Sequence, residues 1–321
     1  MNRKKTKKEL QKNIPSENAS VNCEAAEDLS QANEAETAKE LSQSEVEIVD
    51  EPIASKPKRI WEVDFLRGLM ILFVVWDHLM SDVFDLGPYK TQFFNDWLAF
   101  TKTYYSGSLR AVTHDVFVAL FVFTSGVSCS FSRSNGRRAI KMMAFALLFT
   151  AVTYAASEIV QAKVTIYFNV IHVIALSVAL WTVIEFIWSK CNRNWQKNVF
   201  GVVMTAIILT VLIVGSIADT SKGAWTNTNP MWYFLAYHKD KNFMNTGADF
   251  LPFFPDFGWF LIGAFLGRML YSERKSLFPS VNPKWVSPIA FCGRYSIWIY
   301  FGSQVVMYGL LYLLSQVAGV I

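Results

Sequence analysis

The stretch VDFLRGLMILFVVWDHLMSD, residues 63–82, combines an apolar run long enough to cross a bilayer with several charged or ionisable side chains. A charged group near the centre of a bilayer costs about 2.5–3.5 kcal/mol on insertion scales. These side chains therefore need protein partners or water, and their directions around the helix indicate which of its faces meets protein or water.

The polar side chains of this stretch share one face of the predicted helix. Successive residues turn by about 100° around a helix axis, so the spacing alone gives their directions. Those that fall within about 60° of arc are Asp64, Arg67, His78, Asp82 and Asp85. Asp77 points elsewhere. We expect one side of this helix to face protein or a wet cavity, and the rest to face lipid or packed neighbours.

Further apolar segments follow along the chain. Hydrophobic residues make up 52% of the sequence and charged residues 17%, which long membrane segments explain better than a single buried core. Segments long enough for a bilayer core of about 30 Å occupy residues 61–84, 112–132, 138–160, 166–188, 199–217, 250–271 and 288–316. We predict an all-α membrane protein, a polytopic bundle of about seven transmembrane helices formed by residues 56–321.

The first 55 residues differ in composition from the rest. They begin with the basic run NRKKTKKELQKN and continue with a stretch rich in Glu, Ser, Ala and Gln that has no aromatic residue. Such a composition does not bury enough apolar surface to become ordered, so we predict a disordered cytoplasmic tail over 1–55. The net charge of +4 gives no indication of nucleic-acid binding. The four cysteines show no metal-ligand spacing, so no metal site is predicted.

Basic residues mark alternate connections between the apolar segments. KPKR (56–59), RSNGRR (133–138), SKCNRNWQK (189–197) and ERKSLFPSVNPK (273–284) carry dense positive charge, whereas the connections between them carry less. The positive-inside rule then places the N-terminus in the cytoplasm and the C-terminus outside. We therefore predict a multi-pass protein of the cell membrane.

Histidines gather toward the outer ends of the predicted helices. His78 lies eleven residues after Arg67 and four before Asp82, a spacing at which a carboxylate can orient an imidazole and stabilise its charged form. His114 begins the second predicted span from outside, and His172 lies near the outer end of the fourth. We expect the three histidines to converge on one outer cavity, although each alone is also a common helix-packing or interfacial residue.

A second polar group is predicted at the cytoplasmic end. FTSGVSCSFSRSNGRR (123–138) ends the second span in small hydroxylated residues followed by Arg137 and Arg138. Arg294 begins a further apolar run, FCGRYSIWIY, and therefore needs a partner. Serines, backbone amides and guanidinium groups suit a phosphate-bearing ligand. Positive-inside charge is the simpler explanation for each single arginine.

These motifs together carry a resemblance. Asp64-x-x-Arg67-Gly68 followed by His78 resembles the start of multipass membrane acyltransferases. More closely, the chain resembles the heparan-alpha-glucosaminide N-acetyltransferase catalytic-domain family in its shorter bacterial form. The matching passages lie in family order over nearly all of residues 59–306: RIWEVDFLRGLMILFVVWDHLMSDVFDL, VFVALFVFTSGVSCSFSRSNGRRAIKM, YFNVIHVIALS, DFLPFFPDFGWFLIGAFLGRMLY and CGRYSIWIYFGSQVV.

The resemblance implies transfer of an acetyl group from cytoplasmic acetyl-CoA to an acceptor on the other side of the membrane. This acceptor would be a sugar amine or hydroxyl of a cell-envelope glycan, or a small molecule. His78 is then the first candidate for a general base or transient acyl carrier, with Asp82 orienting it. His172 and His114 are further catalytic candidates. The donor site is assigned to Asp64, Arg67, Arg137, Arg138 and Arg294. Membrane lipids are expected partners, and a homodimer is compatible with the sequence.

The last span departs from the family pattern. Relatives often carry Ile-Tyr-x-x-His-Gln-Pro, whereas here Ser303 and Gln304 follow Tyr300. The catalytic histidine proposed for the larger animal enzyme lies in the loop before the second span, near Tyr105 of this chain, with His114 a short distance away. Which histidine is catalytic, and whether an acyl-histidine forms, stays open. A transporter or flippase and a non-catalytic membrane sensor are the alternative functions.

Overall fold

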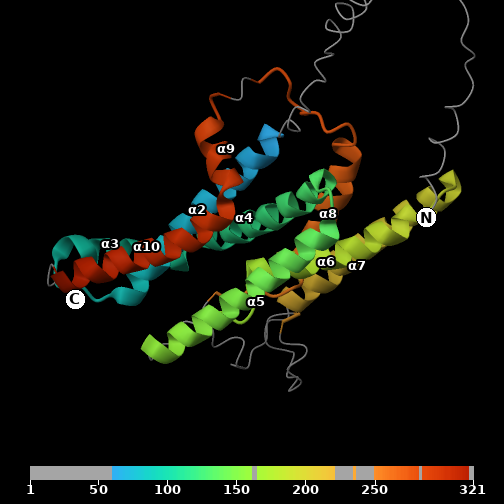
Figure 1. The fold of residues 1–321 in the computed structure, drawn as a ribbon. Coiled ribbons are helices and arrows are strands. Elements are labelled where there is room, and N and C mark those ends of the chain that lie inside the picture. The colour runs from blue at the N-terminus through green and yellow to red at the C-terminus, as the bar shows by residue number, and fades with distance from the viewer. Residues whose placement is uncertain (1–59, 161–164, 221–233, 236–248, 282–283, 318–321) are drawn as a thin grey trace, which may run out of the picture. The chain divides into compact units, whose positions relative to one another are not determined.

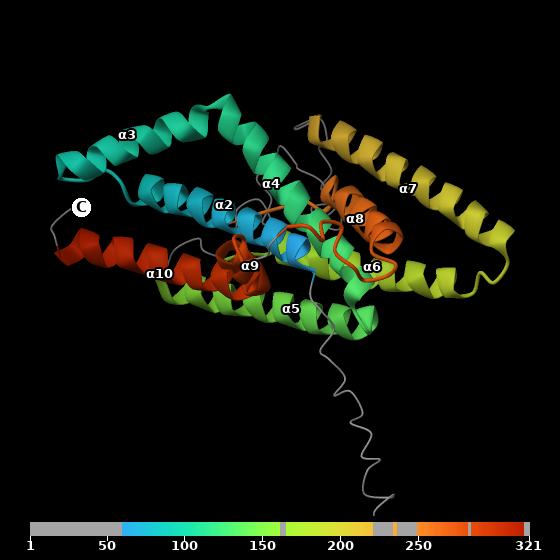
Figure 2. The same ribbon diagram turned by 90° about the horizontal axis from the view of Figure 1, so that it is seen from above.

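The computed structural model describes residues 60–160, 165–220, 234–235, 249–281 and 284–317, so the predicted tail, 1–55, lies outside it. The predicted all-α fold is confirmed: these residues form helices and no strand. The helices are α2 (Trp61–Leu86), α3 (Gln92–Ser106), α4 (Ser108–Val127), the short η1 (Ser128–Phe131), α5 (Asn135–Val160), α6 (Val170–Ser189), α7 (Asn194–Thr220), α8 (Asp256–Leu270), α9 (Ser287–Arg294) and α10 (Ser296–Val317) (Figures 1 and 2).

Helices occupy every segment that the sequence predicted to span the membrane. In the described part of the chain, five are both long and apolar enough to cross it: Ser108–Phe131, Asn135–Ile159, Val170–Ser189, Asn194–Ile217 and Ser296–Leu314. α2 has sufficient length at 26 residues but carries the polar stripe, and α8 has 15 residues. A membrane protein is therefore supported, whereas the number of seven spans stays a prediction.

The structure differs from the predicted elements in two places. α3 is an additional helix whose buried Leu98 packs with Val83 of α2, so the segment after the first span is not a simple loop. The predicted helix over 288–316 is divided into α9 and α10 at Tyr295. Both parts pack on α2, α9 most extensively, and α10 alone of the two is long and apolar enough to cross a membrane.

Small residues allow two helix pairs to approach closely. A Cβ added to Gly293 of α9 would lie 1.7 Å from the carbonyl oxygen of Asp64 in α2. A Cβ added to Gly263 of α8 would lie 2.0 Å from the carbonyl oxygen of Phe123 in α4. Both distances are far below van der Waals contact, so glycine is required for these backbones to touch. The two contacts fix α2 against α9 and α4 against α8.

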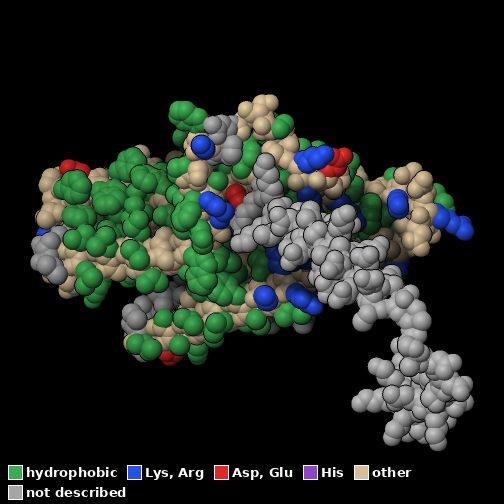
Figure 3. Space-filling view, turned by 45° about the horizontal axis from the view of Figure 1, so that its top comes forward, with side chains coloured by type: hydrophobic (Ala, Val, Ile, Leu, Met, Phe, Trp, Pro, Cys, Tyr) green, Lys and Arg blue, Asp and Glu red, His purple; other side chains and the backbone are tan. Residues whose placement is uncertain are grey.

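Apolar side chains both fill the bundle and cover its outside. Val122, Val173 and Phe260 form part of one buried cluster that joins α4, α6 and α8. Large apolar residues are equally common on the surface, and Leu109 and Ile159 are 77% and 82% exposed. Figure 3 shows hydrophobic side chains over the flank where Figure 1 draws α3 and α10. A surface of this kind needs lipid rather than water around it.

The basic connections that fall within the described residues lie at one end of the bundle. α2, α5 and α7 begin there, and α4, α6 and α8 end there (Figures 1 and 2). Lys and Arg side chains are visible on this side in Figure 3. The helix ends that carry the histidines of α2, α4 and α6 therefore lie toward the opposite end.

Candidate active site

Asp77 joins three helices near the end of α2. Arg110 of α4 donates to its carboxylate through Nε, 2.9 Å from Oδ1, and through Nη2, 2.6 Å from Oδ2. From α3, the Tyr104 hydroxyl donates to Oδ1 at 2.9 Å and the Tyr105 hydroxyl donates to the backbone carbonyl of Asp77 at 3.0 Å. A two-pronged contact between arginine and carboxylate fixes orientation as well as distance. Asp77 therefore positions α3 and α4 against α2.

The hydroxyl of Tyr104 keeps its proton in this arrangement. Burial, and then the hydrogen bond to the Asp77 carboxylate, raise the pKa of Tyr104 to about 12. The hydroxyl is therefore a donor at neutral pH. The guanidinium of Arg110 also lies 4.6 Å from the centre of the Tyr105 ring, which adds a cation–π contact to the group.

His78 faces a different helix, α10. The side chain of Gln304 forms a hydrogen bond with Nδ1 of His78. The Tyr300 ring meets the imidazole edge-on, with ring centroids 5.7 Å apart. His78 is thus held by two side chains that lie one helical turn apart on α10.

Asp82 was the partner that spacing suggested for His78. Its side chain is buried, and among the described residues its Oδ2 atom has no hydrogen-bond partner. Asp85, one turn further, accepts a hydrogen bond from Ser81 at 3.5 Å. An orienting role of Asp82 toward His78 stays a prediction, and Gln304 is the side chain hydrogen-bonded to the ring in the structure.

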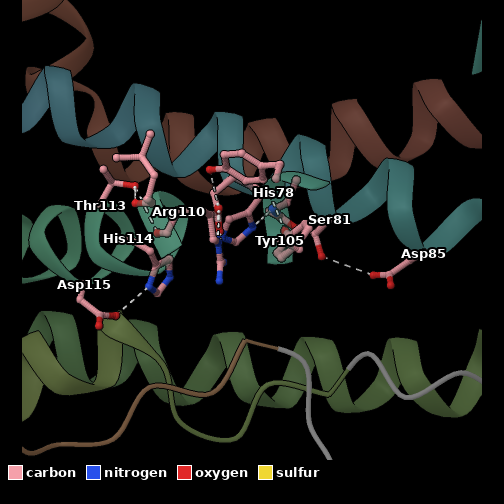
Figure 4. A network of polar contacts seen from close by, with 12 residues as sticks. His78, Ser81, Asp85, Tyr105, Arg110, Thr113, His114 and Asp115 are labelled. Carbon is pink, nitrogen blue, oxygen red and sulfur yellow. Dashed lines mark hydrogen bonds and ion pairs between the residues drawn. The ribbon is translucent and has the colours of Figure 1, made fainter. Parts of the chain in front are cut away.

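A cavity of about 80 Å³ lies beside His78. Its polar lining consists of Asp77, His78, His114, Asp249 and Tyr300. Figure 4 shows Arg110 and Tyr105 close to His78, with His114 one turn further along α4 and Asp115 beyond it. Nδ1 of His114 lies 3.3 Å from Oδ1 of Asp115. Two of the three predicted histidines therefore share one cavity.

Tyr300 and Asp249 are bound to each other and to α6. The Tyr300 hydroxyl donates to the Asp249 carboxylate, and the Asn169 amide lies 3.3 Å from each of these two groups. Asp249 has a φ of 50°, a conformation that costs a non-glycine residue about 1–2 kcal/mol. Its hydrogen bonds offset that cost. The carboxylate is therefore held in place on the cavity wall.

His172 lies behind the cavity rather than on its wall. It is buried, and its Nδ1 and Nε2 atoms lie 3.0 Å from the side-chain oxygens of Asn169 and Thr150. Asn169 and His172 together cap the start of α6. Through Asn169, His172 is connected to Tyr300 and Asp249, which do line the cavity.

The predicted donor residues lie around the other end of α4. From α2, Arg67 donates to the Ser128 hydroxyl and to the carbonyl oxygen of Thr124 at 3.4 Å. From α5, Arg138 donates to the carbonyl oxygen of Ser125 at 3.4 Å. Asp64 lies 3.8 Å from Arg67, as their spacing predicts. Two arginines from different helices thus meet at the last turn of α4.

The remaining two arginines have other surroundings. Arg137 is exposed, and its backbone N–H donates to the Ser134 side chain at 3.4 Å. Arg294 is exposed and lies 5.6 Å from the centre of the Phe291 ring. The structure therefore does not bring Arg137 and Arg294 into the hydrogen-bonded group at the end of α4. No group of three or more metal-ligating side chains occurs in the described ranges.

Sequence analysis missed several members of the site. Asp77 lies off the polar stripe, and this direction takes it to Arg110 and Tyr104. Gln304 lies in the passage IYFGSQVV, which resembles the family motif but has Ser303 in place of its histidine. Asn169 could have been predicted from the sequence, because an Asn directly before an apolar helical segment is a preferred N-cap residue. Only contacts between distant helices reveal the role of Arg110 and Tyr300.

A comparison with protein-family models matches residues 59–305 to heparan-alpha-glucosaminide N-acetyltransferase, catalytic. The chain belongs to this family. The match extends from the start of α2 into α10, and it includes the cavity, Gln304 and the arginines at the end of α4. Membership in the heparan-alpha-glucosaminide N-acetyltransferase family implies a membrane acetyltransferase. No curated protein and no solved structure matches the chain.

Proposed function

We propose that the protein transfers an acetyl group from cytoplasmic acetyl-CoA to an amine or hydroxyl of a cell-envelope glycan on the outer side. The observation that supports this function best is the shared cavity, where His78 and His114 meet Asp249 and Tyr300. Two imidazoles beside carboxylates can supply both a proton acceptor and a hydrogen-bond donor. Family membership supplies the reaction class.

His78 is the proposed general base. In the structure the amide nitrogen of Gln304 lies against Nδ1 of His78. In the proposed reaction this amide is turned by about 180°, so that its carbonyl oxygen accepts from an N–H at Nδ1 of His78 and the lone pair at Nε2 of His78 is free. Nε2 accepts the proton of the acceptor as its nitrogen or oxygen attacks the thioester carbonyl. The carbon–sulfur bond then breaks, and the imidazolium returns the proton to the CoA thiolate. In this proposal an N–H of His114 stabilises the negatively charged oxygen of the intermediate.

Arg67 and Arg138 are the proposed ligands of the CoA phosphates, with Asp64 holding Arg67 and with the exposed Arg137 and Arg294 as further proposed ligands. Their surroundings fit a polar ligand, because the side-chain oxygens of Ser130 and Asn135 are buried without hydrogen-bond partners among the described residues. His78 lies eleven residues from Arg67, about 16 Å along α2. The acetyl end of the donor would cover this distance along the polar side of α2.

The proposed orientation follows from the distribution of charge. The basic connections and the donor arginines lie at one end of the bundle, which the positive-inside rule assigns to the cytoplasm. The N-terminus would then be cytoplasmic and the C-terminus exoplasmic. The cavity with His78 would open toward the acceptor side of a cell membrane.

The experiment uses purified full-length protein in vesicles, with radiolabelled acetyl-CoA on one side and an amino sugar on the other. We expect label on the amino sugar with the wild-type protein and none with His78→Ala. Ser303→Ala is the matched control, because within the described part of the chain the Ser303 hydroxyl donates only to the carbonyl oxygen of Tyr300, in its own helix. Transfer at the wild-type rate by His78→Ala would contradict the assignment of the base. Flux of the amino sugar across the membrane without labelling would favour a transporter. The absence of both labelling and flux would favour a sensor.

A further inference from the structure

A second hollow adjoins the histidine cavity. It has a volume of about 500 Å³ and lies between α2, α3 and α4. Both spaces share four lining residues, Val74, Asp77, His114 and Val118. The two spaces are therefore neighbours that share a wall of four residues, and we call the larger one the α2–α4 groove.

The α2–α4 groove is mainly apolar. Phe73 and Phe117 stack in its wall with ring centroids 3.8 Å apart. Trp76, Phe100 and Leu109 line it and are 45%, 51% and 77% exposed. Side chains of this kind on a membrane protein face hydrocarbon rather than water. The groove is thus accessible to a lipid chain from the bilayer.

Charged groups of the groove are confined to its junction with the cavity. Asp77 and Arg110 form their ion pair there, and His114 belongs to both linings. The groove therefore has the polarity of an amphiphile, with an apolar body and a polar end. That polar end shares Asp77 and His114 with the cavity that His78 lines.

The small volume of the histidine cavity indicates that the acceptor extends beyond it. Ligand pockets usually measure about 300–1,000 Å³, whereas the histidine cavity measures about 80 Å³. The cavity alone is too small for a sugar and its aglycone, and the adjoining groove supplies the missing volume.

From these shared lining residues and the apolar character of the groove we infer that the acceptor is a lipid-linked sugar whose hydrocarbon chain lies in the α2–α4 groove and whose reactive amine or hydroxyl reaches His78. The inference rests on the proposed acetyl transfer and adds the class of acceptor. The groove then binds the lipid chain and thereby raises the occupancy of the cavity by the sugar.

The test compares alkyl glycosides of one amino sugar as acceptors in detergent micelles, with methyl, butyl, hexyl and octyl chains at a fixed ratio to detergent. Burial of one methylene group contributes about 0.8 kcal/mol, which corresponds to about a fourfold change. We expect kcat/KM for the acceptor to rise at least tenfold from methyl to octyl, after correction for partition into micelles. The KM of acetyl-CoA should stay constant along the series.

A pair of variants locates the effect. Thr113 lines the groove, whereas its neighbour Val112 lies outside the lining and is 63% exposed. Thr113→Phe should fill part of the groove and remove most of the chain-length dependence. Val112→Phe adds a ring to the outer surface of the same helix and should leave the dependence unchanged.

The outcomes separate the two proposals. Equal rates for all chain lengths with active enzyme would overturn the lipid-linked acceptor while leaving acetyl transfer intact. A chain-length dependence that Thr113→Phe and Val112→Phe preserve equally would place the chain outside the groove and overturn the inference. No transfer to any member of the series would overturn the proposed function and this inference together.

Discussion

The ion pair between Asp77 and Arg110 is the contact whose removal should best reveal how the site is held together. We consider Asp77→Ala, Arg110→Ala and the double variant. The pair joins α2 to α4 through two parallel hydrogen bonds of 2.9 and 2.6 Å. Each single variant leaves the opposite charge in a half-buried position without its main partner.

The expected magnitude follows from the burial of the pair. The two side chains are 15% and 23% exposed. Exposed ion pairs couple by about 0.2–1 kcal/mol, whereas the loss of one partner of a fully buried pair costs about 3–5 kcal/mol. The Asp77–Arg110 pair lies between these limits and has ideal two-pronged geometry. We expect a coupling free energy of about 2 kcal/mol.

The assay is a double-mutant cycle on the free energy of unfolding, followed by tryptophan fluorescence as the mole fraction of SDS rises in mixed micelles. The pair Arg268–Glu185 supplies a matched control, because its atoms are 3.3 Å apart and its side chains are 41% and 36% exposed. The double-mutant cycle on Arg268 and Glu185 should give a coupling free energy of less than about 1 kcal/mol.

One result would refute the reasoning. If the coupling between Asp77 and Arg110 is no larger than that between Arg268 and Glu185, the two-pronged contact does not hold α4 against α2. The packing of α4 against α2 would then owe its stability mainly to apolar contacts.

Further predictions concern helix packing, titration and the donor site. Gly263→Ala should destabilise the fold by about 1–3 kcal/mol through overpacking, measured by unfolding in SDS. Gly302→Ala is the control, because a Cβ at Gly302 meets nothing within 4 Å, and it should not destabilise the fold. Equal effects of the two variants would contradict the close α4–α8 contact. The pKa of Tyr104, raised from 10.0 to about 12, contributes stability that is complete below pH 10 and is lost as pH rises through 12. The tyrosinate absorbance of wild type minus Tyr104→Phe should therefore titrate near pH 12, and a midpoint near the ordinary value of 10.0 would contradict the contact with Asp77. Arg67→Ala should raise the KM of acetyl-CoA about tenfold, equivalent to about 1.4 kcal/mol, in steady-state assays, and an unchanged KM would remove Arg67 from the donor site.

The sequence was sufficient for the class of fold. Apolar segments of spanning length predict membrane helices because backbone groups in lipid must be hydrogen-bonded within the same segment. That local requirement needs no knowledge of neighbours. It did not predict α3 or the division between α9 and α10, and α3, α9 and α10 all pack against α2.

The sequence also indicated the candidate histidines but not their partners. Helical periodicity gave the directions of His78 and Asp77 around α2, since these depend on one helix alone. It did not predict a role for Asp77, because the partners of this side chain depend on where α3 and α4 lie. Gln304 and Tyr300 are more than 200 residues from His78, and no local pattern connects them.

The sequence by itself determined a bundle of membrane helices, its family and a polar face on the first helix. Only the tertiary structure decided that Asp77 pairs with Arg110, that His78 meets α10, and that the histidine cavity adjoins an apolar groove. The physical reason is that helix formation and membrane insertion depend on neighbours along the chain. A cavity, in contrast, is formed by side chains that only helix packing brings together.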